Sequence, residues 1–376
     1  MKKYLPFLEA FATIVGTVIG LGIFAIPFAA KGAGVAPTVA LIVFVAAMSA
    51  LVSFLFAEIV IFDKREECIV SYARRYLGSW MGWAEAVSVI FGYTGTILAY
   101  VLAVAIFSKE LIPFNGTYFW PIILFYSGVS GLILLFRKPK NLGNLEIALA
   151  GLMCAAFLFI SWKSVPYWKP LENDWSKLAV PYGVVWFSMT GGSAIPLAVR
   201  ILARKGREVF SVISLAYLFI AFITIAFFVA ALKIGGDGIG PDPFVAMGEK
   251  MGRWVLYAGT LIGILAVVTS HWTLAAYFKN ILNEDLGINP IFSWFLVVFL
   301  PIILITLGIS NFVSVVGLVG LVAGTFDALL LMAIYKRVFR RKNALPRILP
   351  FRVPGVVIWT AFLLLVGAAL SSILML

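Results

Sequence analysis

The feature of this chain that most limits its fold is a series of eleven apolar runs, each long enough to cross a lipid bilayer. A transmembrane helix needs roughly 17–25 predominantly apolar residues, and 62% of the 376 residues here are hydrophobic. We therefore predict an all-α membrane protein with eleven transmembrane helices. The predicted spans are 9–30, 35–61, 82–107, 119–136, 145–162, 179–202, 210–232, 254–278, 291–307, 312–335 and 356–376.

The basic residues fall mainly in alternate loops between these spans. With a cytoplasmic N-terminus, 21 of the 29 Lys and Arg residues lie in segments predicted to be inside. This positive-inside bias predicts a multi-pass protein of the plasma membrane, with the N-terminus cytoplasmic and the C-terminus extracellular. It also explains the net charge of +12 without a nucleic acid, so we expect the lipid bilayer as a partner and no nucleic acid. The two cysteines, Cys68 and Cys154, are expected to be free thiols.

Helix-breaking residues interrupt two of the predicted spans near their middle. The first span contains Gly16, Gly20, Gly22 and Pro27, and the sixth contains Gly191, Gly192 and Pro196. Unpaired backbone at this depth is tolerated only where it is buried in protein or lines a water-filled cavity. Single kinks from Gly and Pro are common in membrane helices, but here the breaks open the two halves of the chain in opposite directions. We interpret this pair as the mark of an inverted repeat with a binding site at the midplane.

The residues around both breaks resemble those of a known transporter superfamily. In the first span these are Gly16-x-x-Ile19-Gly20-Leu21-Gly22-x-Phe24 followed by Pro27, and in the sixth Phe187-Ser188-x-Thr190-x-Gly192 followed by Ile195-Pro196. Together with Ser71-Tyr72, they are similar to the leucine-transporter fold of the amino acid/polyamine/organocation superfamily, most closely its amino acid/auxin permease branch.

The resemblance implies one integral membrane transport domain built as a five-plus-five inverted repeat with broken helices 1 and 6. The implied units are 1–163 (helices 1–5), 164–338 (helices 6–10) and 339–376 (a cytoplasmic loop and accessory helix 11).

The two breaks are suited to an amino-acid zwitterion on physical grounds alone. Free N–H groups from Gly20 through Leu21 and Gly22 form a positive helix start for the carboxylate. The carbonyls of Val18, Phe187 and Thr190 are expected to accept hydrogen bonds from the ammonium. Candidates for the wall that selects the substrate side chain are Tyr93, Thr96, Tyr100, Ser188, Met189, Ser193 and Trp272. Lipid contact or interhelical packing is the alternative role for each aromatic side chain.

The eighth span offers oxygen donors for a coupling ion. The carbonyls of Gly16, Ile19 and Ala266 with the hydroxyls of Thr269 and Ser270 would form an uncharged five-oxygen site for sodium. This pattern matches the sodium site that transporters of this fold place between helices 1 and 8. The alternative is that both hydroxyls bond back to their own helix. Related symporters with a second sodium carry an amide residue just after Gly22, where this chain has Ile23, so we predict one ion site and no other cofactor.

Proton coupling is the alternative to sodium. Span 147–162 has no Lys, which argues against the family's lysine mechanism, but ionisable residues inside a membrane are functional candidates by default. Asp327 and His271 lie deep enough to be candidate proton sites. Glu58, Glu85 and Glu146 lie closer to the inner interface, where we expect them to pair with basic residues.

The sequence therefore predicts a secondary active amino-acid transporter, a sodium symporter with one ion site working by alternating access around helices 1 and 6. The alternatives are a proton-coupled or uncoupled exchanger of amino acids or organic cations, and an amino-acid sensor that does not transport. An enzyme is not expected, because the single histidine and the scattered carboxylates form no nucleophilic or metal cluster.

Overall fold

We describe a computed structural model of the protein, covering residues 5–63, 68–111, 119–136, 143–341, 348 and 353–375. In these residues all regular structure is helical, which confirms the predicted fold class. Eight helices are long and apolar enough to cross a membrane, one pair of shorter helices forms a bent span, and two more apolar helices are shorter. This set is compatible with the eleven predicted spans. The described Cys68 and Cys154 are both free thiols, as expected.

The described residues of the first half of the chain form seven helices. Their bounds are α1 Leu5–Val18, α2 Gly22–Ala29, α3 Val35–Asp63, α4 Ile69–Leu77, α5 Ser79–Leu111, α6 Phe119–Phe136 and α7 Gly143–Ser164. α1 and α2 meet at an angle of 45°, so the first span is broken where the glycines predicted a break. α4 is short and amphipathic, with Arg74 and Arg75 in its last turn.

The second half contains the remaining helices and several short turns. Their bounds are η2 Val165–Tyr167, η3 Trp175–Lys177, α8 Tyr182–Met189, η4 Gly192–Ala194, α9 Ile195–Ile201, α10 Gly206–Gly235, η5 Gly236–Gly238, α11 Pro243–Met251, α12 Arg253–Asn280, η6 Ile281–Asp285, α13 Pro290–Thr306, α14 Phe312–Val319, η7 Gly320–Gly324, α15 Thr325–Arg341 and α16 Gly355–Leu374. The sixth span is broken between α8 and α9, again at the predicted glycines. η6 and η7 are π-helical, and η7 joins α14 and α15 into one span.

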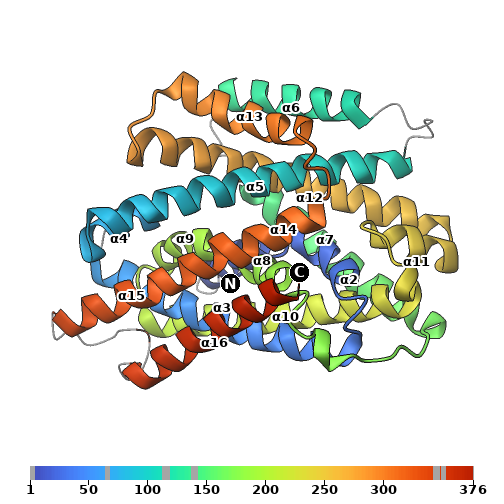
Figure 1. Cartoon of the computed structure of the whole chain (residues 1–376), viewed down its shortest axis with the longest axis horizontal. Coiled ribbons are helices and arrows are strands. Elements are labelled where there is room, and N and C mark those ends of the chain that lie inside the picture. Colours follow the sequence, from blue (N-terminus) through green and yellow to red (C-terminus); the bar gives the residue numbers. More distant parts are fainter. Residues whose placement is uncertain are drawn as a thin grey trace.

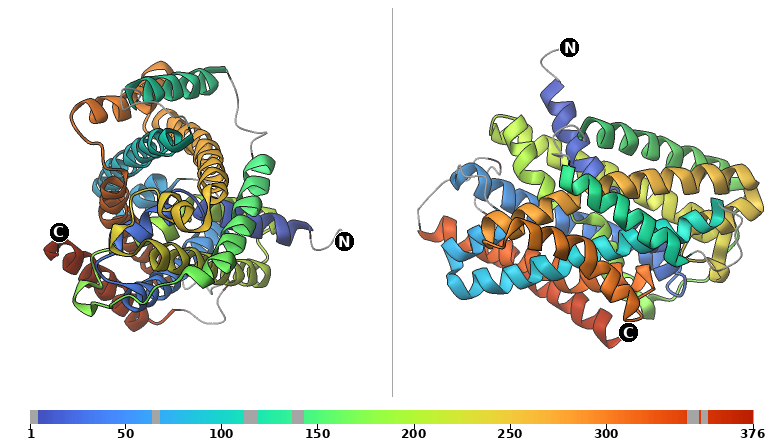
Figure 2. Two further views of the ribbon diagram at one scale, coloured as in Figure 1. Left: turned by 90° about the vertical axis from the view of Figure 1, so that its right-hand side faces the viewer. Right: turned by 90° about the horizontal axis from the view of Figure 1, so that it is seen from above.

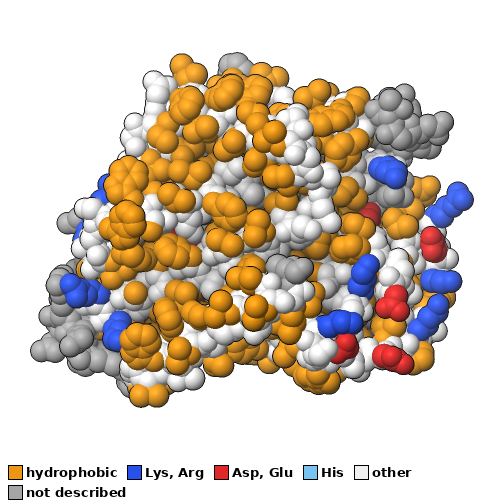
Figure 3. All heavy atoms as spheres, viewed as in Figure 1, with side chains coloured by type: hydrophobic (Ala, Val, Ile, Leu, Met, Phe, Trp, Pro, Cys, Tyr) orange, Lys and Arg blue, Asp and Glu red, His pale blue; other side chains and the backbone are white. Residues whose placement is uncertain are grey.

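Most helices run roughly along the long axis of the molecule, and they form two packed groups that lie side by side (Figure 1). α5, α6, α12 and α13 pack against one another, whereas α1, α3, α8, α9 and α10 form the second group. Figure 3 shows a broad hydrophobic face between two ends; Lys and Arg lie at both ends, and Asp and Glu gather at the right-hand end. This distribution fits a bilayer whose normal runs along the long axis. The end carrying α4 is the predicted inner end, and the end carrying α11 is the predicted outer end.

Phenylalanine side chains close the molecule on the predicted outer side. Phe24, on α2 just after the first break, is fully buried. Its ring lies 5.4–6.0 Å from four others, centroid to centroid, in edge-on or tilted contacts that aromatic rings favour. These four are Phe107, Phe157, Phe227 and Phe244, from α5, α7, α10 and α11. We call this group the outer aromatic seal.

The loop before α8 covers the same end of the molecule. The side-chain oxygen of Asn173 accepts a hydrogen bond from the Ala36 amide at 2.9 Å, and the Asp174 amide donates to the Ala33 carbonyl at 2.9 Å. Gly34 adopts a positive φ of +85° beneath this loop, and a Cβ there would lie 2.3 Å from the Glu172 carbonyl. The loop therefore requires glycine at this turn.

Phe24→Ala tests the seal. Truncating a buried Phe leaves a cavity and costs about 3–5 kcal/mol in soluble protein cores. We expect the purified variant to unfold at a clearly lower temperature than the wild type. Phe125→Ala is the matched control because Phe125 is 74% exposed on α6. Equal thermal stability of the two variants would contradict the role assigned to the seal.

Candidate functional site

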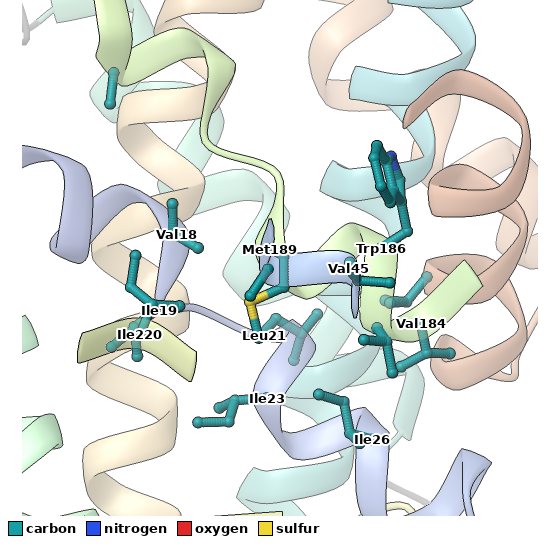
Figure 4. Close-up of a cluster of buried hydrophobic side chains, with 14 of the residues drawn as sticks. Val18, Ile19, Leu21, Ile23, Ile26, Val45, Val184, Trp186, Met189 and Ile220 are labelled. Carbon is teal, nitrogen blue, oxygen red and sulfur yellow. The ribbon is translucent and has the colours of Figure 1, made fainter. Parts of the chain in front are cut away.

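The break in the first span leaves backbone groups without helical partners. α1 ends with the Ile19 amide donating to the Val15 carbonyl at 2.8 Å, and α2 begins with the Phe24 amide donating to Leu21 at 3.2 Å. Between these bonds, the Gly20 and Leu21 amides donate to no group in the described chain, and the Val18 carbonyl accepts from none. Figure 4 shows this break, with Val18, Ile19 and Leu21 in the same buried cluster as Met189 and Trp186 of α8.

The break in the sixth span has a similar character. The Thr190 amide donates to the Phe187 carbonyl at 3.2 Å and the Ala194 amide to Gly191 at 3.1 Å. The Phe187 carbonyl, predicted to face an ammonium, thus already accepts one hydrogen bond and has one lone pair left. The Thr190 carbonyl accepts from no described backbone amide.

Glycines allow the backbones of the two broken spans to pack directly against each other, and the backbone of α8 to pack directly against α14 and η7. A Cβ on Gly22 would lie 2.8 Å from the Ser188 Cα, so α2 begins directly against α8. On the other side of α8, a Cβ on Gly183 would lie 2.1 Å from the Gly317 carbonyl, and one on Gly320 would lie 1.9 Å from the Gly183 carbonyl. Only glycine fits such contacts. The π-helical turn η7 therefore braces the second broken span, in keeping with the frequent location of π-bulges at functional sites.

A cavity of about 210 Å³ lies between the two helix groups and is lined by both breaks. Most residues predicted to bind substrate line it. They are Val18, Gly20, Leu21, Gly22, Tyr93, Thr96, Tyr100, Phe187, Ser188, Met189, Thr190 and Ser193. A Cβ on Gly20 would lie 3.9 Å from the Tyr100 hydroxyl oxygen, which places this hydroxyl beside the first break. The hydroxyls of Thr96 and Ser188 donate back to the Gly92 and Val184 carbonyls of their own helices.

Two predicted residues of α12 lie away from the cavity. The Trp272 indole N–H donates to the Ser130 hydroxyl of α6 at 3.2 Å, and Trp272 does not line the cavity. His271 is buried; its Nδ1 lies 2.8 Å from the Tyr126 hydroxyl, and its ring stacks on Tyr100. Both side chains thus connect α12 to its packing neighbours α5 and α6.

The residues proposed for sodium lie on α1, the first break and α12. Gly16 packs against α7, where a Cβ would meet the Ala150 Cβ at 3.4 Å, and α7 packs in turn against α12. Gly16, Ile19 and Ala266 are buried. The Thr269 side chain lies outside the described part of the structure, as does that of Glu146.

Several residues that line the cavity did not stand out in the sequence. α3 contributes Ser49 and Ser53, and the Ser53 hydroxyl lies 2.8 Å from that of Tyr217 on α10. The Ser49 hydroxyl and the Trp186 indole N–H are buried without a hydrogen-bond partner in the described structure, although both residues line the cavity. Hydroxyls inside apolar spans are a signal that could have identified Ser49 and Ser53.

The acidic residues near the inner end are arranged differently from the prediction. Among the residues that the structure describes, Glu85 has no basic partner; it faces Asp327 of α15, which accepts a hydrogen bond from the Ser88 hydroxyl at 2.8 Å. The predicted pairing of Glu85 with a basic residue is therefore wrong, because the side chain points into the bundle rather than toward the interface. Glu58 is buried and accepts from the Ile348 amide at 2.8 Å.

The cavity extends from the breaks toward the predicted inner end. Its lining includes Ile69 of α4, Tyr277 of α12 and Leu331 of α15. Thr17, Thr190 and Ser193 are solvent-exposed although they lie at the breaks. Figure 2 shows α1 leaning away from the bundle toward the N-terminus, and Leu5 and Leu8 on it are exposed. With the outer aromatic seal closed, this arrangement leaves the site open toward the predicted inner end.

Comparison with known proteins places this geometry in context. The model of the tryptophan/tyrosine permease family matches residues 4–167, somewhat less than half of the chain. No curated protein matches the sequence. The narrower resemblance to the amino acid/auxin permease branch stays a prediction.

Solved structures match nearly the whole chain. The crystal structure of MhsT in complex with L-phenylalanine superposes with a TM-score of 0.69 at 15% identity, covering 97% of this chain and 98% of MhsT. A manganese transporter of Eremococcus coleocola superposes with a TM-score of 0.64 at 13% identity, covering 99% of this chain and 86% of the transporter. These likenesses show the leucine-transporter fold. Together with the family match, they support a multi-pass membrane transporter rather than an enzyme.

Gly22→Ala tests the contact between the two breaks. The added methyl meets backbone on α8 that cannot yield without moving the broken helix. We expect substrate uptake to fall by about 10–100-fold, the loss caused when a site is displaced by about 1 Å. Gly151→Ala on α7 is the matched control, because a Cβ there meets nothing within 4 Å. Uptake by Gly22→Ala equal to that of the control would show that the close approach is dispensable.

Proposed function

We propose that this protein is a secondary active transporter of amino acids that works by alternating access around the two broken spans. The observation that carries the proposal is the single cavity into which both breaks open. Free amides at one break and a free carbonyl at the other supply the donors and acceptors that an amino-acid backbone requires. The cavity volume of about 210 Å³ is below the roughly 300–1,000 Å³ of sites for drug-sized ligands, which favours one small molecule.

The substrate carboxylate would bind the Gly20 and Leu21 amides at the start of α2. The Tyr100 hydroxyl, beside the same break, is a further donor within the cavity. The ammonium would be held by the Val18 and Thr190 carbonyls. The Phe187 carbonyl contributes its remaining lone pair.

The substrate side chain is proposed to be aromatic. Phe56, Tyr93 and Trp186 line the cavity beyond the breaks and provide ring surfaces for stacking or edge contacts. The match to the tryptophan/tyrosine permease model and the phenylalanine bound in MhsT support the same class. The unpartnered Trp186 N–H and Ser49 hydroxyl offer polar partners for an indole or a phenol.

Uptake into proteoliposomes tests this function. We expect radiolabelled tryptophan, tyrosine or phenylalanine to accumulate, and unlabelled aromatic amino acids to compete better than alanine or lysine. The same ligands are expected to raise the unfolding temperature of the purified protein, because a ligand that binds only the folded state stabilises it. Thermal stabilisation without uptake would favour an amino-acid sensor. The absence of both stabilisation and uptake would reject the proposal.

For the coupling ion we propose one sodium held by Gly16, Ile19, Ala266, Thr269 and Ser270. Backbone carbonyls and hydroxyls form an uncharged oxygen site suited to a hard monovalent cation. Such a site would fasten α1 to α12 by way of the packing both make with α7. Sodium binding would thereby oppose the leaning of α1 away from the bundle.

Thr269→Ala tests the sodium site. Removing one of five oxygen ligands is expected to raise the sodium concentration needed for half-maximal uptake while changing the apparent affinity for substrate much less. Uptake would be measured over a sodium series at constant ionic strength, with Thr260→Ala as the control on the same helix. An unchanged sodium dependence would remove Thr269 from the site.

A second candidate for the coupling ion is the proton. The observation that favours it is Asp327, a carboxyl in a membrane span that lines the same cavity as the two breaks. His271, the other residue predicted for this role, does not line the cavity. Uptake driven by a pH gradient in sodium-free buffer would select the proton over sodium.

A further inference from the structure

Glu85 is a buried carboxyl that the proposed substrate and sodium sites do not use, and no positive charge faces it in the described structure. Glu85 lies on α5 with no exposed surface, and neither of its carboxyl oxygens has a hydrogen bond of good geometry in the described structure. A buried ionised carboxylate without a partner is among the costliest groups a protein can contain, more so within a membrane. Its presence therefore requires an explanation beyond packing.

The group that Glu85 faces is a second carboxyl. Asp327, in the first turn of α15, interacts directly with Glu85, although the two carboxyls are not oriented for a well-formed hydrogen bond between them. Ser88, one turn after Glu85, donates to Asp327 Oδ1 at 2.8 Å. Ser88 and Asp327 line the cavity, whereas Glu85 lies behind them.

The described groups around the pair carry no positive charge. Tyr93 of α5 interacts with both carboxyls, and next to it lie Tyr277 of α12 and Cys68 before α4. Asp285 of η6 lies close to Cys68 and accepts from the Ser71 hydroxyl. No Lys or Arg in the described structure interacts with Glu85 or Asp327.

Three basic side chains on helices packed around the pair interact with other groups. Arg74 of α4 lies over the Trp83 ring, and Lys279 of α12 donates to the Leu134 carbonyl of α6. Lys336 of α15 lies over the Trp359 ring of α16.

Two adjacent carboxyls in such a site cannot both be ionised, because like charges repel strongly where water does not screen them. We propose that Glu85 and Asp327 form a proton-binding site that holds one shared proton and exchanges it with the cavity through Asp327. The proton leaves a carboxylic acid as H⁺ to cavity water and returns to the resulting carboxylate, with no other bond changed. Coupling of this proton to substrate movement rests on the proposed transport function and takes the proton, the second candidate above, as the coupling ion. The existence of the site rests on neither.

The position of the pair gives the proton a mechanical role. Glu85 belongs to the helix group of α5, α6, α12 and α13, whereas α15 packs mainly against α3, α4 and η7. Loss of the shared proton would place two negative charges across this junction and drive α5 and α15 apart. We therefore expect the arrangement described here, with the cavity open toward the predicted inner end, to be stable only with the pair protonated.

The transport arm of the test uses proteoliposomes with the membrane potential clamped. A gradient of about 1 pH unit supports about tenfold accumulation for one proton per substrate, because one pH unit corresponds to ~1.36 kcal/mol. We expect Glu85→Gln and Asp327→Asn to abolish this accumulation while retaining exchange of internal for external substrate. Glu208→Gln is the matched control, since Glu208 is an exposed carboxylate paired with Lys205 at 3.2 Å on α10. Accumulation equal to wild type in both neutral variants would overturn the coupling.

The second experiment detects the protonated carboxyl directly and does not depend on transport. Infrared difference spectra of the purified protein between acid and alkaline pH are expected to show a protonated carboxyl that disappears in both Glu85→Gln and Asp327→Asn and persists in Glu208→Gln. If no carboxyl signal is lost in the two variants, the site itself is rejected. A lost signal in a protein that moves no amino acid would keep the proton site and reject only the transport function.

Discussion

The structure depends on how backbone polar groups are satisfied inside an apolar environment. Two spans leave part of their helical hydrogen bonds unmade, and this is tolerable only because the exposed groups face a shared cavity instead of lipid. Glycine makes the arrangement possible at the contacts of Gly22 with Ser188 and of Gly183 with Gly320. The broken segments are thus held with their backbones in direct contact with each other and with η7, which fixes the free amides and carbonyls without a full set of helical hydrogen bonds.

The two ends of the site differ in physical character: one is closed by aromatic packing and the other is open and polar. Phe24 lies two residues after Gly22, so the segment that begins at the proposed carboxylate site also carries the centre of the outer aromatic seal. The opposite end is lined by hydroxyls, phenols and one carboxyl, which water can solvate. A movement of α2 that disturbs the binding amides must therefore also disturb the aromatic packing, and this links occupancy of the site to closure of the outer side.

Sequence reasoning could locate the spans and the breaks because each depends on local chemistry. Apolar runs must be helices in a bilayer, and Gly20, Gly22 and Gly191 interrupt them wherever the fold is assembled. The directions of side chains on unbroken helices could not be predicted in this way. Trp272 and Tyr100 both lie within spans, yet one donates to Ser130 on α6 and the other faces the first break. The pairing of Glu85 with Asp327 joins positions 242 residues apart, so only the packed structure brings it to light.

The carboxyl pair is connected to the proposed substrate site through a short series of contacts. Asp327 follows the π-helical turn η7 by three residues, and a Cβ on Gly324 in that turn would lie 2.6 Å from the Trp186 ring. The Tyr182 hydroxyl shares a hydrogen bond with the Thr325 hydroxyl at 3.1 Å, so α8 is held to this turn at two points. Coupling between two sites requires a structural element that has two arrangements, and each site must be able to shift the balance between them. η7 is such an element, because separation of α15 from α5 would pull on the same turn that braces the second break.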